Sequence, residues 1–84
     1  MSTNESLNAV RNQYIPSGHA SGTTKYIASA KGSILTDVEG NEYIDFAGGI
    51  GVMNIGHCHP KVVAAVKAQA EKFFHTCFMV TPYE

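Results

Sequence analysis

Apolar residues recur at helical spacing near the beginning of the chain. Three of them would share one helix face: Leu7, Val10 and Tyr14. Pro16 ends this pattern, because proline cannot continue a helix. Ser2 and Glu5 match a capping box, in which their side chains bind free N–H groups of the first turn. We predict a short amphipathic helix whose single apolar stripe favours an arm packed on a neighbouring element.

A second helical pattern covers residues 60–74. Pro60 suits the first helical position, and His59 is kept out of the helical region because a proline follows it. The apolar positions of this stretch share one face: Val62, Val63, Val66, Ala70, Phe73 and Phe74. Most of the polar side chains lie off that face, so the pattern predicts an amphipathic helix.

Between the two helices the pattern changes to that of β-strands. Residues 33–38 and 42–46 flank a short connection in which Gly40 can adopt the positive φ that a hairpin loop needs. Ile44 and Phe46 would face the same side of the second strand, since side chains alternate along a strand. We therefore predict a β-hairpin.

Loops are predicted before and after the hairpin. Residues 17–24 are polar and rich in glycine, which is typical of a loop. Residues 47–56 are also glycine-rich, and such a backbone can pass close to another group. The stretch 75–80 is apolar and is expected to be extended. The predicted fold class is thus an α+β unit of helix, hairpin, glycine-rich loop and helix.

The composition indicates that this unit packs against another part of a protein. Charged residues make up 15% of the chain, against about 25% in soluble globular domains. A small isolated domain exposes much of its surface and needs charge there. We therefore expect part of the apolar surface, including Phe78, Met79 and Tyr83, to be covered by something else.

Composition also excludes several classes of partner. The net charge is −1 and the lysines are spread along the chain, which argues against nucleic acid. No apolar stretch approaches the roughly 20 residues of a membrane span, and residues 1–8 do not resemble a secretory signal. The two cysteines are too few for a disulfide framework. These features predict a cytoplasmic protein with reduced thiols.

Two nucleotide-binding motifs match this sequence only in part, because residues that each motif requires are replaced by others. The glycines of residues 51–58 have the spacing of a P-loop, but His57 and Cys58 stand where Lys and Ser or Thr are required. In the dinucleotide-binding pattern, Asn54 stands where the third glycine belongs. The sequence therefore argues against a nucleotide site.

Two further groups of polar residues allow alternative interpretations. Four side chains could form a tetrahedral zinc site: His57, His59, His75 and Cys77. Local hydrogen bonding is the alternative, because a histidine before a helix can satisfy backbone groups of a turn. Four acidic residues cluster on the hairpin and are expected on its solvent-facing surface: Asp37, Glu39, Glu42 and Asp45. None of the lysines lies in an apolar run of the kind that activates a lysine amine.

Two strings of residues resemble a known family. Residues 37–46 read D-x-x-G-x-x-Y-x-D-F, and residues 54–60 read N-x-G-H-x-H-P. Both resemble the N-terminal region of class III aminotransferases, which are pyridoxal-phosphate enzymes of fold type I. Together with residues 75–78, the strings are most similar to the branch that contains 4-aminobutyrate aminotransferases.

The resemblance implies a transaminase that moves an amino group from an ω-amino acid, such as 4-aminobutyrate, to a 2-oxo acid. In this family a lysine holds pyridoxal 5'-phosphate as an imine, and an aspartate keeps the pyridinium nitrogen protonated. The T-F-x-K and D-E-x-x-[ST]-G contexts of that lysine and aspartate do not occur in this chain, and the turn that holds the cofactor phosphate is also missing. We therefore expect residues 1–84 to be an N-terminal segment that is inactive alone, with no catalytic or cofactor-binding residue of its own.

The pattern of elements divides the segment into an arm helix and loop, residues 1–24, and a hairpin–loop–helix unit, residues 25–84. The resemblance, in turn, implies two site residues. Ile50 corresponds to a residue that lines the substrate pocket in relatives, and Met79 to a second edge of that pocket. The family works as a homodimer with sites at the subunit interface. The alternative is a small binding or interaction module, with or without the metal site.

Overall fold

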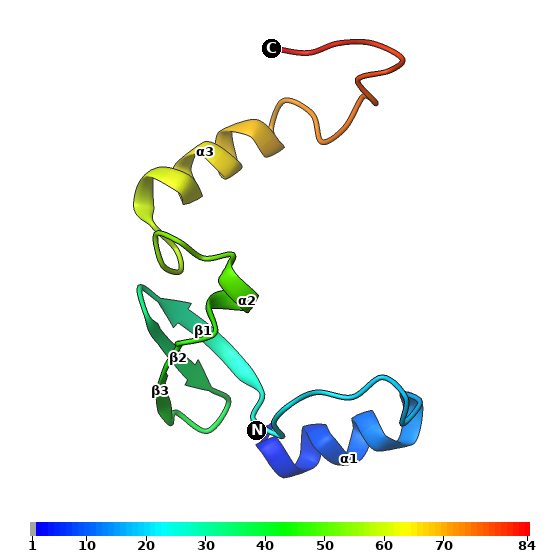
Figure 1. Ribbon diagram of the computed structural model, residues 1–84, viewed down its shortest axis with the longest axis vertical. Coiled ribbons are helices and arrows are strands. Elements are labelled where there is room, and N and C mark those ends of the chain that lie inside the picture. The colour runs from blue at the N-terminus through cyan, green and yellow to red at the C-terminus, as the bar shows by residue number, and fades with distance from the viewer. Residues whose placement is uncertain (1) are drawn as a thin grey trace.

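A three-stranded antiparallel sheet forms the middle of the molecule, and a helix leads away from each side of it (Figure 1). The computed structural model describes residues 2–84, and Met1 lies outside the described residues. The elements are α1 (Asn4–Tyr14), β1 (Ile27–Lys31), β2 (Ile34–Asp37), β3 (Glu42–Ile44), α2 (Gly48–Gly51) and α3 (Pro60–Ala70). This order confirms the predicted α+β unit.

The predicted hairpin consists of β2 and β3, which pair with Leu35 opposite Tyr43. Both strands are shorter than the predicted ones: β2 lacks one predicted residue at each end, and β3 lacks the last two. A further strand, β1, pairs with the other edge of β2 and places Ala30 opposite Leu35. β1 and β2 are joined by a two-residue turn of Gly32 and Ser33, in which Gly32 has a φ of 58°. Glycine adopts this conformation without steric cost, so the turn follows directly from the sequence.

Helix α1 forms as predicted, but the predicted capping residues are wrong by one position. Thr3 is the N-cap: its hydroxyl accepts from the Ser6 N–H at 3.0 Å, and the Ser6 hydroxyl accepts from the Thr3 N–H at 2.9 Å. Ser2 and Glu5 are exposed and are not the capping pair. Starting the helix at Asn4 frees the Asn4 side chain to bind the sheet, which accounts for the shift.

Helix α3 begins where it was predicted to begin and ends earlier. The His59 ring nitrogen Nδ1 accepts from the Lys61 N–H at 3.2 Å, so the predicted histidine cap is confirmed. The helix stops at Ala70 instead of residue 74. The carbonyl of Gln69 accepts from the N–H groups of Lys72 and Phe73, and this tighter turn closes the helix.

The stretch after α3 is folded back and not extended, contrary to the prediction. The Cys77 carbonyl accepts from the N–H groups of Val80 and Thr81 at 2.7 and 3.1 Å, which makes a turn. The ring of Tyr83 packs edge-on against Phe73 and Phe78, with centroid distances of 5.5 and 5.7 Å. Aromatic pairs favour this geometry, so the three rings hold the turn together.

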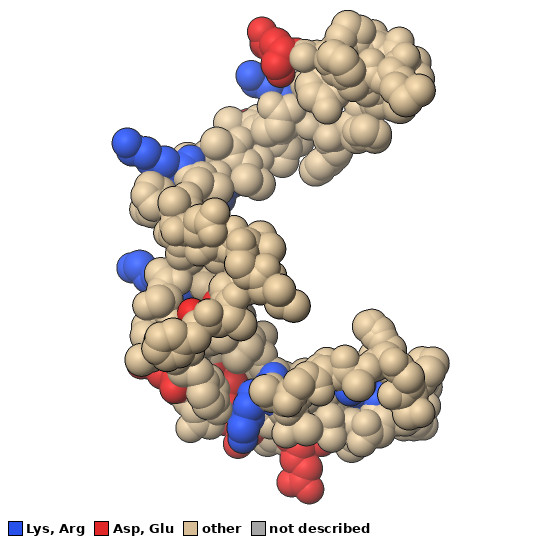
Figure 2. Space-filling view, viewed as in Figure 1, with Lys and Arg blue, Asp and Glu red and all other residues tan. Residues whose placement is uncertain are grey.

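The described residues contain no buried apolar side chain. Among residues 2–84 only Asn4 and Asp37 are buried. The predicted apolar face of α3 instead lines two open grooves of about 480 and 260 Å³. The radius of gyration is 17.0 Å, against roughly 12 Å for a compact domain of this length. Figure 2 accordingly shows a C-shaped molecule whose inner side is nearly free of charged residues, and no helix within residues 2–84 is long and apolar enough to cross a membrane.

We expect the isolated chain to associate and to melt without cooperativity. Folding is driven mainly by apolar burial, and none is complete here, while contiguous exposed apolar patches drive association. Size-exclusion chromatography with multi-angle light scattering gives the mass, and circular dichroism gives the melting curve. A sharp monomer peak with a cooperative transition would contradict the prediction.

Candidate functional site

The loop of residues 46–56 is closed at its base against one turn of the sheet. At its beginning, the Asp45 N–H donates to the Ser33 carbonyl at 2.8 Å. At its end, His57 and Gly32 exchange two backbone hydrogen bonds of 2.8 and 3.0 Å. A Cβ atom on Gly56 would lie 3.0 Å from the Gly32 backbone, and Gly56 has a φ of 79°, so both the space and the conformation favour glycine here. Both ends of the loop therefore meet at the turn of Gly32 and Ser33.

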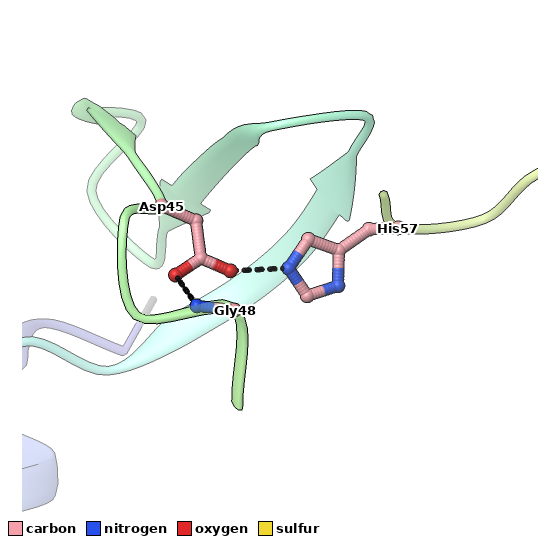
Figure 3. A network of polar contacts seen from close by, with 3 residues as sticks. All are labelled: Asp45, Gly48 and His57. Atoms are coloured by element: carbon pink, nitrogen blue, oxygen red, sulfur yellow. Dashed lines mark hydrogen bonds and ion pairs between the residues drawn. The ribbon is translucent and has the colours of Figure 1, made fainter. Parts of the chain in front are cut away.

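The side chains of Asp45 and His57 join the two ends of this loop (Figure 3). His57 Nε2 lies 2.7 Å from Asp45 Oδ2, and the Gly48 N–H donates to Asp45 Oδ1 at 2.8 Å. The side chains are only 10% exposed for Asp45 and 21% exposed for His57. The hydrogen bond from His57 and that from Gly48 lower the pKa of Asp45. The expectation that Asp45 faces solvent is therefore wrong.

At its tip, the loop takes a conformation that few residues adopt. Gly48, Gly49, Ile50 and Gly51 all have positive φ, between 56° and 74°, and Ile50 has a φ of 64°. A β-branched residue in the left-handed region is a rare outlier, and such outliers cluster at functional sites. The short helical turn α2 projects from the sheet toward the open side of the molecule (Figure 1).

The two predicted pocket residues are both exposed in the described structure. Ile50 is 93% exposed at the tip of the loop, and Met79 is 95% exposed in the turn after α3. That turn lies beyond the far end of α3, away from α2 (Figure 1). The structure does not bring the two residues together, and their role in a pocket stays a prediction.

A second polar cluster, centred on Asp37, ties α1 to the sheet. Asp37 is 2% exposed and accepts hydrogen bonds from the Asn4, Asn41 and Tyr43 side chains at 2.9, 3.2 and 2.9 Å. Asn4 in turn accepts from the Tyr26 N–H at 2.7 Å, just before β1. The predicted solvent exposure of Asp37 is therefore wrong, because these donors replace the water that a carboxylate needs.

Hydrogen bonding decides the ionisation of this cluster. Burial raises the pKa of Asp37, but the hydrogen bonds from Asn4, Asn41 and Tyr43 outweigh it and hold the pKa well below its usual range. The same hydrogen bond to Asp37 raises the pKa of the Tyr43 hydroxyl. The cluster is held by an ionised carboxylate, and its place in the fold is structural.

The proposed metal ligands are not assembled. Within residues 2–84, no group of three or more His, Cys, Asp or Glu side chains could hold a metal ion. His57 binds Asp45, and His59 caps α3. Local hydrogen bonding, the alternative interpretation, accounts for both histidines.

Comparison with known proteins gives consistent matches over the whole fold. The family described as Aminotransferase class-III matches residues 16–84. The chain is 51% identical over 84 residues to the 4-aminobutyrate aminotransferase of Escherichia coli, covering 100% of this chain and 20% of that protein. It is 54% identical over 82 residues to the 5-aminovalerate aminotransferase of Pseudomonas putida, covering 98% of this chain and 19% of that protein.

A solved structure supports the same assignment of the fold. The ornithine aminotransferase of Toxoplasma gondii, crystallised with oxidised glutathione and with partial occupancy of PLP at its active site, is similar with a TM-score of 0.73. The identity is 40%, and the match covers 83% of this chain and 16% of that one. The chain thus spans about a fifth of the length of the curated relatives that it matches.

Proposed function

The chain belongs to the class-III aminotransferase family, and from this membership we propose that it is the N-terminal segment of a pyridoxal-phosphate-dependent transaminase. The complete enzyme would move an amino group from an unbranched ω-amino acid to a 2-oxo acid. The observation that carries the proposal is the identity of 51–54% over practically the whole chain to enzymes named for 4-aminobutyrate and 5-aminovalerate. Both donors carry a plain methylene chain between amine and carboxylate.

The residues of this chain do not by themselves fit the cofactor. A lysine that forms an imine is activated by an apolar or cationic setting that keeps its amine unprotonated. None of the five lysines of the chain lies in an apolar run or in the T-F-x-K context of the family's cofactor lysine: Lys25, Lys31, Lys61, Lys67 and Lys72. We therefore assign the cofactor lysine to the part of the complete enzyme beyond this segment.

In the proposed enzyme, this segment contributes an apolar wall of the substrate site. Ile50 supports this assignment, because its side chain is free of packing within residues 2–84 and stands on a strained loop. Met79 would add a second apolar edge. Such walls suit a methylene chain, which gains free energy by contact with apolar side chains.

The exposed apolar surface supports a further part of the proposal. The apolar face of α3 and the aromatic residues after it stay exposed to water unless another part of the protein covers them. We propose that the remainder of the chain and a second subunit together cover this surface, so that the enzyme is a homodimer.

The test is an assay of the complete protein that contains this chain, loaded with pyridoxal phosphate. We expect amino transfer from 4-aminobutyrate and 5-aminovalerate to 2-oxoglutarate, with a lower kcat/KM for ornithine, whose extra amino group meets an apolar wall. The isolated chain should show no transfer and no single borohydride-reducible lysine adduct. Absence of transfer by the complete protein, or transfer by residues 1–84 alone, would overturn the proposal.

A further inference from the structure

We propose that Asp45 and His57 form a latch that holds the loop of residues 46–56 in one shape and thereby positions Ile50 against the substrate. The inference rests on the proposed function, because it takes Ile50 as a substrate contact. Neither latch residue is assigned any contact with the substrate. They act through the loop and are therefore positioning residues.

The Asp45 carboxylate lies at the beginning of the loop and contacts two other parts of it. One oxygen accepts from the Gly48 N–H inside the loop, and the other lies 2.7 Å from His57 at its end. Because the pKa of Asp45 is lowered, the carboxylate is ionised and only accepts, so His57 Nε2 carries the hydrogen. One side chain thus connects the beginning, the interior and the end of the loop (Figure 3).

The loop around Ile50 has a conformation that needs contacts to hold it. Three glycines surround Ile50, and glycine-rich backbone has many accessible conformations in the absence of constraints. Ile50 itself has an unfavourable φ of 64°, and such strain persists only where the surroundings over-determine it. The backbone bonds to the sheet fix the ends of the loop, whereas Asp45 also reaches Gly48, two residues before Ile50.

The contact between the Asp45 and His57 side chains is largely shielded from water. Ion pairs on an exposed surface contribute little, because water and salt screen them. Asp45 and His57 are mostly buried, and the two backbone bonds between His57 and Gly32 restrict where the ring can move. A charge-assisted hydrogen bond in this setting is stronger than a neutral one, and it suits a contact that sets geometry.

The kinetic test uses the complete enzyme and three variants. His57→Ala removes the latch, and His57→Gln retains an N–H donor for Asp45. We expect His57→Ala to raise KM for 4-aminobutyrate about tenfold with kcat changed less than about twofold, and His57→Gln to recover most of this loss. His59→Ala is the matched control, since His59 caps α3 outside the latch, and its KM should stay unchanged.

Hydrogen exchange gives a readout that does not depend on activity. In His57→Ala the amides of residues 46–56, Gly48 above all, should exchange faster, whereas in His59→Ala they should not. Unchanged exchange in His57→Ala would overturn the latch, even if Ile50→Gln raises KM. Faster exchange together with an unaffected KM in Ile50→Gln would instead overturn the substrate role of Ile50 and leave the latch standing.

Discussion

Replacing Asp37 with alanine in the complete protein is expected to release helix α1 from the sheet. Five hydrogen bonds end on this carboxylate, donated by the Glu39 and Asn41 N–H groups and by the Asn4, Asn41 and Tyr43 side chains. Donors left unpaired at a buried position are costly, and no buried apolar contact compensates within residues 2–84. Hydrogen exchange of the α1 amides measures the release.

Acid should weaken the same contact. The folded pKa of Asp37 is depressed, and an unfolded aspartate has a pKa of about 3.9. The contribution of Asp37 to stability is therefore fully present above about pH 4, and it is lost as the pH falls below that value toward the folded pKa. Asp37→Asn should remove this acid-dependent part. Glu42→Gln is the matched control on the same hairpin. The prediction would be refuted if the α1 amides were equally protected from hydrogen exchange in both variants.

The second large effect is expected from Ile50→Gln in the complete enzyme. If Ile50 contacts the methylene chain of the substrate, a polar side chain there should raise KM for 4-aminobutyrate. The rise should correspond to a loss of roughly 1–3 kcal/mol of apolar contact free energy. The absorption spectrum of the bound cofactor should stay the same, because Ile50 is not assigned to the cofactor. Steady-state kinetics and a melting curve on one preparation measure both properties.

Val52→Gln is the matched control for this variant, since Val52 is an exposed apolar residue on the same loop. It should leave KM close to the wild-type value. A lower melting temperature without a change of KM in Ile50→Gln would mean that Ile50 only packs against the rest of the enzyme.

The elements that local sequence determines could be predicted well. Helix α3 was predicted from signals that act over only a few residues. These are the spacing of its apolar residues, the proline at its first position and the histidine before it, and the structure shows the helix with both of these residues at its start. The same holds for the hairpin and its glycine-containing connection. Where two neighbouring residues could each play the same part, the sequence alone did not decide between them. Both Ser2 and Thr3 can cap a helix, and the choice depends on Asn4 reaching Asp37, which lies 33 residues away.

The acidic residues show the same limit more clearly. Charged side chains are usually exposed, so a solvent-facing cluster was the reasonable expectation for Asp37 and Asp45. Their partners become visible only when distant segments meet, since His57 lies 12 residues beyond Asp45. One signal was available. Asp45 lies in the first of the two strings that resemble the family, and His57 lies in the second. The two strings stand on either side of the glycine-rich loop.

The closure of the loop at one turn has a consequence for engineering. Since both ends of residues 46–56 meet at Gly32 and Ser33, we expect that this segment can be exchanged for that of a relative without breaking the pairing of the sheet. The natural boundaries for an exchange between relatives are Asp45 and His57. Gly56 should be kept in such an exchange, because a Cβ atom there would lie 3.0 Å from the Gly32 backbone. If Ile50 contacts the substrate as proposed, such an exchange should change the preference of the complete enzyme among amino donors.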